Sequence, residues 1–236
     1  MPLSFRPTAL VFDVLGTVVD EDGTVIRASA ALLAGSTART PIATSRAEAE
    51  AFAQEWMARH SADLQAVVAG DRPWLSGDAL RREALESTLT MHPEVRPTPE
   101  GLDEAANVGY RLDPWPDSVA AINRLADVYT VIALTNGGTE QTEAMSERAG
   151  INWTHVLTGD DARQFKPHPA MYRLPLDEYR LDPEVTLFVA AHPWDLDAAA
   201  EAGYRTALVL RPEVEAPADA YDLQVADLGA LADALL

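Results

Sequence analysis

Short apolar runs alternate with longer helical patterns along most of the chain, and this rhythm predicts a sheet of buried strands joined by helices. The first run, Thr8–Val14, is rich in β-forming residues and leads into a tight turn at Gly16. Further strands are expected at 130–135, 155–157, 186–190 and 206–210. Because a helical pattern separates each strand from the next, we expect a doubly wound, Rossmann-like α/β core with a mostly parallel sheet.

The segment after the first strand has a different pattern and predicts helices only. One helix is expected from Ser45 to Val68, because Ser45 and Glu48 have capping-box spacing and Gly70 provides a stop. Two more are expected at 77–91 and 100–110. The buried face of the first helix is expected to carry Phe52, Trp56, His60, Leu64 and Val67.

These two patterns divide the chain into two expected domains. Residues 1–20 and 111–236 are expected to form the α/β core, and residues 21–110 are expected to form an all-helical cap domain inserted after the first strand. No internal repeat or low-complexity tract interrupts either pattern.

Composition then removes several classes of function. The chain has 236 residues, a net charge of −19, 47% hydrophobic residues and no cysteine, as expected for a soluble globular protein. Without cysteine there is no disulfide, thiolate metal site, iron–sulfur cluster or cysteine nucleophile. The acidic charge argues against nucleic acid or an anionic membrane as a partner. The N-terminal seven residues lack an apolar stretch, so we expect no signal peptide and a cytoplasmic location.

The basic residues are unevenly divided between arginine and lysine. Seventeen of the eighteen are arginine, and Lys166 is the only lysine. An ammonium group is a compact point charge, whereas guanidinium is broad and planar. Lys166 is therefore a candidate for a task that arginine cannot perform.

Polar side chains collect just after the predicted strands. In open parallel sheets the active site lies outside the carboxyl ends of the strands, so residues from distant parts of the chain can meet there. The candidates are Asp13, Thr135 and Asn136, Lys166, and His192 with Asp195. Their types are two carboxylates, a hydroxyl–amide pair, an ammonium group and an imidazole.

Most of these residues lie in four short motifs that follow one another along the chain. The motifs are Phe12–Thr17 followed by Asp20, Leu134–Gly137, Lys166-Pro167 and Trp194-Asp195. The ordered set resembles the four motifs of the haloacid dehalogenase superfamily. The resemblance implies that Asp13 is the nucleophile, that Thr135 and Asn136 bind the substrate, and that Lys166 and Asp195 complete the catalytic group.

Two positions argue against the magnesium-dependent phosphatases of that superfamily. The acid/base aspartate of those enzymes aligns with Leu15, and their metal-binding aspartate after the fourth strand aligns with Ala191. Leucine cannot transfer a proton, and magnesium prefers oxygen ligands that include carboxylates. We therefore expect no metal and no cofactor.

The remaining pattern resembles the metal-independent branch, the type II L-2-haloacid dehalogenases. Trp194-Asp195, Tyr172 six residues beyond Lys166, and Thr17 of the Gly-Thr pair match that branch. Thr17 is thus grouped with Asp13, Lys166 and Asp195 as catalytic. The residues expected at the substrate are Leu15, Thr135, Asn136, Tyr172, His192, Trp194 and Arg59.

The chemistry implied is a displacement at carbon. Asp13 would attack the carbon bearing the leaving group of a small anionic 2-halo carboxylic acid by SN2, and water would hydrolyse the resulting aspartyl ester. Lys166 would offset the negative charges of nucleophile and substrate. Asp195, paired with Lys166, would orient or deprotonate the water.

Two departures from the branch leave questions open. The arginine that receives the halide is replaced by Met57, and Arg59 lies about 200° further around the helix, because a helix turns about 100° per residue. Arg27 and Arg72 are other candidates for that arginine's role. Four roles are open for His192, which stands where that branch has an asparagine. It could replace the asparagine, donate to a leaving halide, act as a base, or cap the helix that starts at Pro193.

Three alternatives to a haloacid dehalogenase remain open. The same aspartate could open a strained ring such as that of azetidine-2-carboxylate, which needs no halide site. The chain could also be a magnesium-dependent phosphatase or a catalytically inactive binding protein. A homodimer is a further expectation from the family resemblance.

Overall fold

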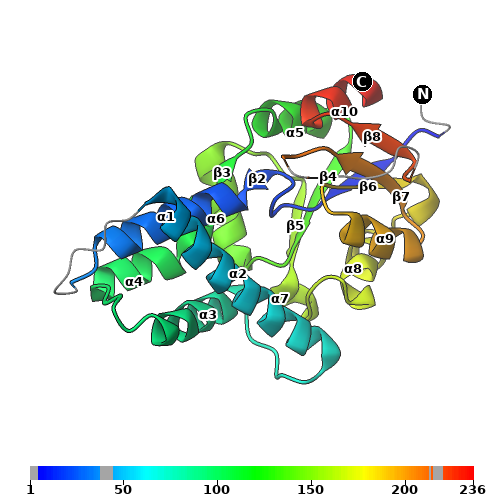
Figure 1. Ribbon diagram of the computed structural model, residues 1–236. Coiled ribbons are helices and arrows are strands. Elements are labelled where there is room, and N and C mark those ends of the chain that lie inside the picture. Colours follow the sequence, from blue (N-terminus) through cyan, green and yellow to red (C-terminus); the bar gives the residue numbers. More distant parts are fainter. Residues whose placement is uncertain (1–4, 38–44, 213, 215–219) are drawn as a thin grey trace. The chain divides into compact units, whose positions relative to one another are not determined.

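The computed structural model describes residues 5–37, 45–212, 214 and 220–236 (Figure 1). The chain divides into two compact units, one made of Met1–Asp20 with Asp113–Leu236 and the other of Glu21–Leu112. That the second unit is a separate cap domain stays a prediction. No helix in the described ranges is both long and apolar enough to cross a membrane.

The first unit is built on a six-stranded sheet with the order β5-β4-β1-β6-β7-β8, in which every neighbouring pair is parallel. Its strands are β1 (Ala9–Phe12), β4 (Thr130–Thr135), β5 (His155–Thr158), β6 (Thr186–Ala190), β7 (Arg205–Val209) and β8 (Leu223–Val225). The predicted fold class is confirmed. The edge strand β8 was not predicted, because a three-residue strand with one exposed position carries little periodicity.

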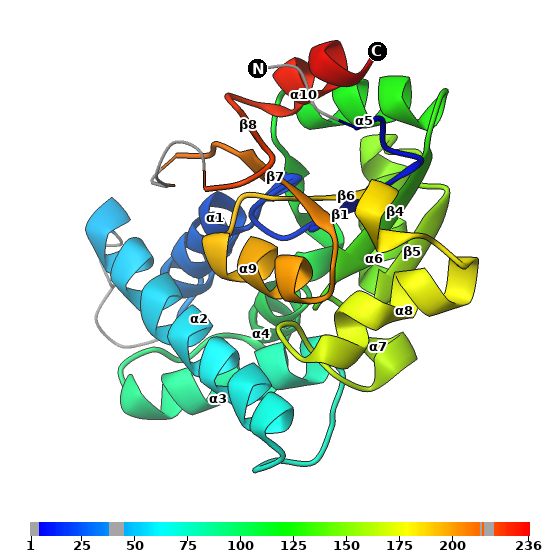
Figure 2. The same ribbon diagram turned by 90° about the vertical axis from the view of Figure 1, so that its right-hand side faces the viewer.

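Helices cover both faces of this sheet (Figures 1 and 2). One side carries α5 (Ser118–Ala126) and α10 (Leu228–Leu235), and the other carries α8 (Pro169–Tyr179) and α9 (Pro193–Glu201). Val11 of β1 packs in one cluster with Met171 of α8 and Leu196 of α9, while its neighbour Leu10 is also fully buried. Strands that are buried on both faces appear in sequence as continuous apolar runs.

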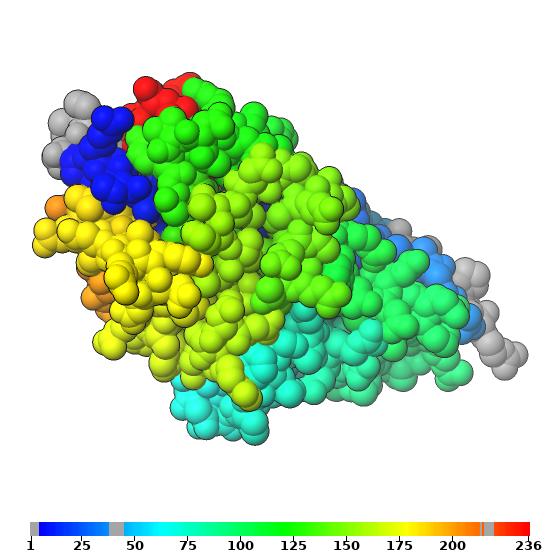
Figure 3. Space-filling model, turned by 180° about the vertical axis from the view of Figure 1, so that it is seen from behind, coloured from blue at the N-terminus to red at the C-terminus, as the bar shows by residue number. Residues whose placement is uncertain are grey.

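The other elements of this unit are short or connect strands. They are α6 (Thr139–Ala149), α7 (Gly159–Ala162), η2 (Pro183–Val185) and an antiparallel pair, β2 (Val19–Asp20) with β3 (Asp113–Pro114). Figure 3 shows the rear surface, on which the segment around α8 is drawn in yellow. Within α8, Arg173, Asp177 and Glu178 are exposed.

The second unit contains only helices in its described residues. They are α1 (Glu21–Ala34), α2 (Arg46–Ala69), α3 (Gly77–Met91), α4 (Pro99–Ala106) and the 3₁₀ helix η1 (Val108–Arg111). The predicted span 77–91 is confirmed. The single helix predicted for 100–110 is wrong in extent, because α4 ends at the cap residue Asn107 and the chain continues as a 3₁₀ turn. Helix α1 was not predicted as a separate helix; its residues were expected only to be part of the helical segment.

Helix α2 begins and ends where its capping residues predicted. The Ser45 side chain accepts a hydrogen bond from Glu48 N, the Glu48 carboxylate accepts one from Ser45 N, and Gly70 ends the helix with φ of 79°. Along the predicted buried face only Leu64 is half-buried, and the other four side chains are buried. The indole of Trp56 donates to the Arg81 carbonyl at 2.9 Å, which ties α2 to α3.

The capping box gives a stability prediction. We expect Ser45→Ala to lower the free energy of unfolding by about 1 kcal/mol, the usual cost of losing a serine N-cap. Urea unfolding followed by circular dichroism measures the change. The matched control is Ser87→Ala at an exposed position of α3, which should stay within about 0.5 kcal/mol of the parent protein. Equal losses in both variants would contradict the capping argument.

Candidate active site

Asp13 lies directly after β1, at the carboxyl end of the central strand, and its side chain is 5% exposed. Its Oδ1 accepts a hydrogen bond from Lys166 Nζ at 2.7 Å. Its Oδ2 accepts one from Thr17 Oγ1 at 2.6 Å and lies 3.1 Å from His192 Nδ1. Both carboxylate oxygens are therefore fixed in direction before any substrate binds.

Lys166 bridges two carboxylates. Its Nζ donates to Asp13 Oδ1 at 2.7 Å and to Asp195 Oδ2 at 2.6 Å, and its side chain is 2% exposed. The Asn136 side chain holds the lysine backbone, since its Oδ1 accepts from Lys166 N at 2.7 Å and its Nδ2 donates to Lys166 O at 3.2 Å. The loop after β4 thus positions the only lysine of the chain.

Asp195, in the first turn of α9, is fully buried. Its Oδ1 accepts from the Tyr172 hydroxyl at 2.6 Å, and its Oδ2 accepts from Lys166. Tyr172 is in turn held through its carbonyl, which accepts from the Tyr204 hydroxyl at 2.7 Å. Each oxygen of this second carboxylate is occupied by a side-chain donor.

Burial and charge oppose each other at these groups. Burial alone would raise the pKa of Asp13, but Lys166 and His192 overcome it and hold that pKa well below its usual value. Burial would lower the pKa of Lys166, and the two carboxylates raise it instead. Burial, with the neighbouring Asp13 charge, raises the pKa of Asp195 against the lowering effect of Lys166. Asp13 is therefore ionised and Lys166 is charged near neutral pH.

Thr17 joins two strand ends. Its Oγ1 donates to Asp13 and accepts from the backbone N of Ala191 at 2.8 Å, just after β6. Gly16 has φ of 77°, and a Cβ there would lie 2.7 Å from His192 Cε1. A glycine is needed at this turn both for its backbone angle and for the imidazole packed against it.

The structure brings six of the predicted site residues into one hydrogen-bonded network: Asp13, Thr17, Lys166, Tyr172, His192 and Asp195. Asn136 contacts this network through the Lys166 backbone. Thr135 is fully buried, and its Oγ1 accepts from Gly137 N at 3.1 Å. Substrate binding by Thr135 and Asn136 stays a prediction, and both side chains also have internal partners.

Leu15 and Trp194 lie beside the network without joining it. Leu15 is half-buried and forms an isolated β-bridge with Val19. Trp194 is 47% exposed, and its ring centroid lies 5.8 Å from that of His192. Their contact with substrate stays a prediction.

The candidates for the halide site lie in the second unit. Met57 and Arg59 are both half-buried on α2, and Met57 packs against the apolar cluster of that unit. Arg72 pairs with Asp63 and Glu83. A substrate contact by Arg59 or Arg72 stays a prediction, as it does for Arg27, whose Nη2 donates to Thr24 Oγ1 at 2.9 Å.

Two functional features were not found by sequence reasoning. The Asn136 amide supports the Lys166 loop, and the Thr17 hydroxyl receives a backbone N–H from beyond β6. Both are contacts between segments far apart in the chain. The order of the motifs was the one signal in the sequence that these distant segments lie close together.

The donor set of this network suits an ammonium ion. Lys166 already occupies one oxygen of each carboxylate, and the Leu15 side chain is only hydrocarbon. Among the residues that the structure describes, no group of three or more acidic or imidazole side chains is arranged to hold a metal ion.

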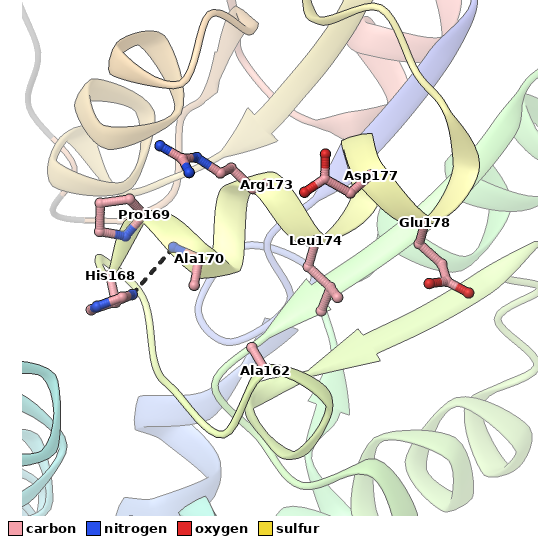
Figure 4. Close-up of a pocket in the computed structure, with 8 residues that line it drawn as sticks. All are labelled: Ala162, His168, Pro169, Ala170, Arg173, Leu174, Asp177 and Glu178. Atoms are coloured by element: carbon pink, nitrogen blue, oxygen red, sulfur yellow. Dashed lines mark hydrogen bonds between the residues drawn. The ribbon is translucent and has the colours of Figure 1, made fainter.

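A surface pocket of about 490 Å³ lies elsewhere on the first unit, along α8 (Figure 4). It is lined by Ala162, His168, Pro169, Ala170, Arg173, Leu174, Asp177 and Glu178. None of the predicted site residues lines it. The His168 ring caps α8, because its Nδ1 accepts from Ala170 N at 3.2 Å.

Comparison with known proteins decides the family. A model of the haloacid dehalogenase-like hydrolases matches residues 7–203. The chain belongs to this family. The resemblance carried by the four sequence motifs is thereby confirmed.

Several haloacid dehalogenase-like hydrolases are similar to this chain over different lengths. (S)-2-Haloacid dehalogenase 4A of Burkholderia cepacia is 27% identical over 216 residues, which is 88% of this chain and 86% of that relative. Haloacetate dehalogenase H-2 of Moraxella is 33% identical over 104 residues, which is 43% of this chain and just under half (46%) of that relative. The crystal structure of a defluorinating L-2-haloacid dehalogenase has a TM-score of 0.87 and 32% identity, with 100% of this chain and 99% of that chain covered.

The buried charges of this haloacid dehalogenase-like hydrolase give a pH-dependent stability prediction. We expect Lys166→Met to lower the free energy of unfolding by about 3–5 kcal/mol at pH 7.5, because two buried carboxylates lose their counter-ion. The loss should shrink towards pH 5. In the parent protein the depressed pKa of Asp13 contributes stability above the unfolded pKa of about 3.9, whereas carboxylates without the cation regain protons as the pH falls.

Urea unfolding at the two pH values measures this effect. The control is Arg124→Met, which removes an exposed partner of Asp233 and should change stability by less than about 1 kcal/mol. A loss for Lys166→Met that is the same at both pH values would contradict the account.

Proposed function

We propose that this chain is a metal-independent 2-haloacid dehalogenase. The observation that carries the proposal is a buried Asp13 carboxylate that accepts a hydrogen bond from the Lys166 ammonium group, with leucine at residue 15, where the motif resemblance places the acid of a phosphatase. The relatives reported above, which are named as dehalogenases of haloacids, support the same reaction class.

The first half-reaction is a displacement at carbon. One Asp13 oxygen forms a bond to the carbon that carries the halogen, and the carbon–halogen bond breaks with its electron pair leaving as halide. An aspartyl ester remains. A carboxylate of depressed pKa is a weak base, so proton transfer does not compete with attack on carbon.

Lys166 reduces the repulsion between the nucleophile and an anionic substrate. Two carboxylates at close range repel strongly where water is excluded, and a fixed ammonium group offsets that repulsion without reorganisation. The whole chain carries a net charge of −19, so the ammonium group of Lys166 acts against the overall field of the protein. We propose a small 2-halo carboxylic acid as the substrate, in line with the relatives named as dehalogenases of haloacids.

Asp195 acts on this reaction through Lys166. Its carboxylate is fully buried and accepts a hydrogen bond from the same ammonium group that contacts Asp13. In the second half-reaction, water attacks the carbonyl carbon of the Asp13 ester and the hydroxy acid leaves. A homodimer and a cytoplasmic location stay predictions.

Removal of the nucleophile tests the proposal. We expect Asp13→Asn to abolish halide release from (S)-2-chloropropionate, because a neutral amide oxygen cannot displace chloride. Asp127→Asn, at an exposed position after α5, is the matched control and should retain parent activity. Chloride release, measured with purified protein in the presence of EDTA, gives the result.

Three outcomes would count against the dehalogenase. Phosphate release from p-nitrophenyl phosphate that EDTA abolishes would indicate a phosphatase. Ring opening of azetidine-2-carboxylate without halide release from any haloacid would indicate the same nucleophile on another substrate. Turnover of none of these compounds would indicate a binding protein.

A further inference from the structure

We propose that His192 is the base that takes the proton from the hydrolytic water in the second half-reaction. This inference rests on the proposed function and assigns a step that the motif resemblance gives to Asp195. The two candidates differ in exposure, in hydrogen-bonding partners and in their distance from the carbon that water must attack.

Asp195 is poorly placed to act on a water molecule. Its side chain is 0% exposed, and its two oxygens accept hydrogen bonds from Lys166 Nζ and the Tyr172 hydroxyl at 2.6 Å each. Burial, with the neighbouring Asp195 charge, raises the pKa of Tyr172, so that hydroxyl stays a donor. Each oxygen keeps a second lone pair, but the complete burial of the side chain leaves a water molecule from solvent no open approach to it.

His192 has the required position. Its Nδ1 lies 3.1 Å from Asp13 Oδ2, which is bonded directly to the carbon that water attacks. Its ring is held between the turn at Gly16 and the Trp194 ring. The side chain is 35% exposed, so a proton taken from water can pass on to solvent. His192 is also the N-cap residue of α9, yet its side chain makes no capping hydrogen bond.

Formation of the ester changes the charges that set the pKa of His192. Asp13, Lys166 and Asp195 face the imidazole, together with the N-terminus of α9. In the free enzyme, burial lowers the pKa of His192, but the hydrogen bond and charge of Asp13 raise it above its ordinary value. Esterification removes the hydrogen-bonded Asp13 charge, which is the main group raising that pKa; burial, Lys166 and the helix N-terminus then lower it, against only the weaker raising effect of Asp195. The imidazole then loses its proton to solvent and becomes a base.

The step balances as follows. Neutral His192 accepts one proton from water while the water oxygen bonds to the Asp13 carbonyl carbon. The bond from that carbon to the ester oxygen, which came from Asp13, then breaks. This oxygen leaves with the substrate carbon, and the second water proton converts it to the hydroxyl group of the product. The products are the hydroxy acid, the Asp13 carboxylate and the imidazolium form of His192. The carboxylate and the imidazolium are the pair of ions present in the free enzyme. The proton lost earlier to solvent is the one that dehalogenation releases overall.

The test separates ester formation from ester hydrolysis. With His192→Gln, whose amide can still donate to Asp13, we expect a burst of one chloride per site from (S)-2-chloropropionate and then turnover roughly 10²-fold slower than in the parent protein. Intact-protein mass spectrometry of quenched samples should show the ester accumulating on Asp13. Added imidazole should accelerate hydrolysis in His192→Ala, because general bases can be rescued chemically.

Controls separate a base from a positioning residue. Asp195→Asn should slow the chloride burst itself without ester accumulation, because Lys166 loses a carboxylate partner. His92→Gln, on the second unit beyond α3, should behave like the parent protein. His192→Gln without ester accumulation, or ester accumulation in Asp195→Asn alone, would overturn the inference. Absence of chloride release from the parent protein would instead overturn the proposed function.

A second readout does not need turnover. Asp13→Asn imitates the uncharged ester at residue 13, so the pKa of His192 measured by NMR should fall relative to the parent protein. An unchanged or higher pKa in this variant would contradict the charge switch.

Discussion

The site depends on one buried ammonium group that lies between two carboxylates. Removing three charges from water is costly, and the arrangement is stable only if their remaining hydrogen-bonding positions are filled. Lys166 contacts both carboxylates, Tyr172 occupies the other oxygen of Asp195, and Thr17 and His192 occupy the other oxygen of Asp13. Every element around the site must therefore be held in register, which the parallel sheet achieves by placing β4, β1 and β6 side by side (Figure 1).

The same interaction selects the chemistry. A carboxylate that stays ionised inside the protein is a poor base and an available nucleophile, and its fixed cation lowers the cost of bringing a second anion near it. That cation is covalently part of the chain and occupies one oxygen of each carboxylate. The imidazole of His192 adds a group whose protonation depends on whether Asp13 is charged. Formation of the ester on Asp13 therefore prepares His192 to accept a proton in the hydrolysis step.

Sequence reasoning predicted the parts of this structure that depend on local pattern or motif. The strands at 130–135 and 186–190 and the capped helix α2 follow from apolar runs and capping residues. The motif order predicted that Asp13, Lys166 and Asp195 would meet. The burial of Asp195 and the use of Asn136 on the Lys166 backbone were not predictable, because they depend on packing between segments about 30 residues apart.

One isotope measurement tests the central claim most directly. The protein, in excess over (S)-2-chloropropionate, completes a single turnover in H₂¹⁸O, and the peptide that contains Asp13 is then analysed by mass spectrometry. Attack by Asp13 on carbon followed by hydrolysis at its carbonyl carbon predicts that ¹⁸O enters the Asp13 carboxylate, while the lactate formed carries unlabelled oxygen from Asp13. Label in the lactate and none in Asp13 would show that water attacks the substrate directly, and it would contradict the account.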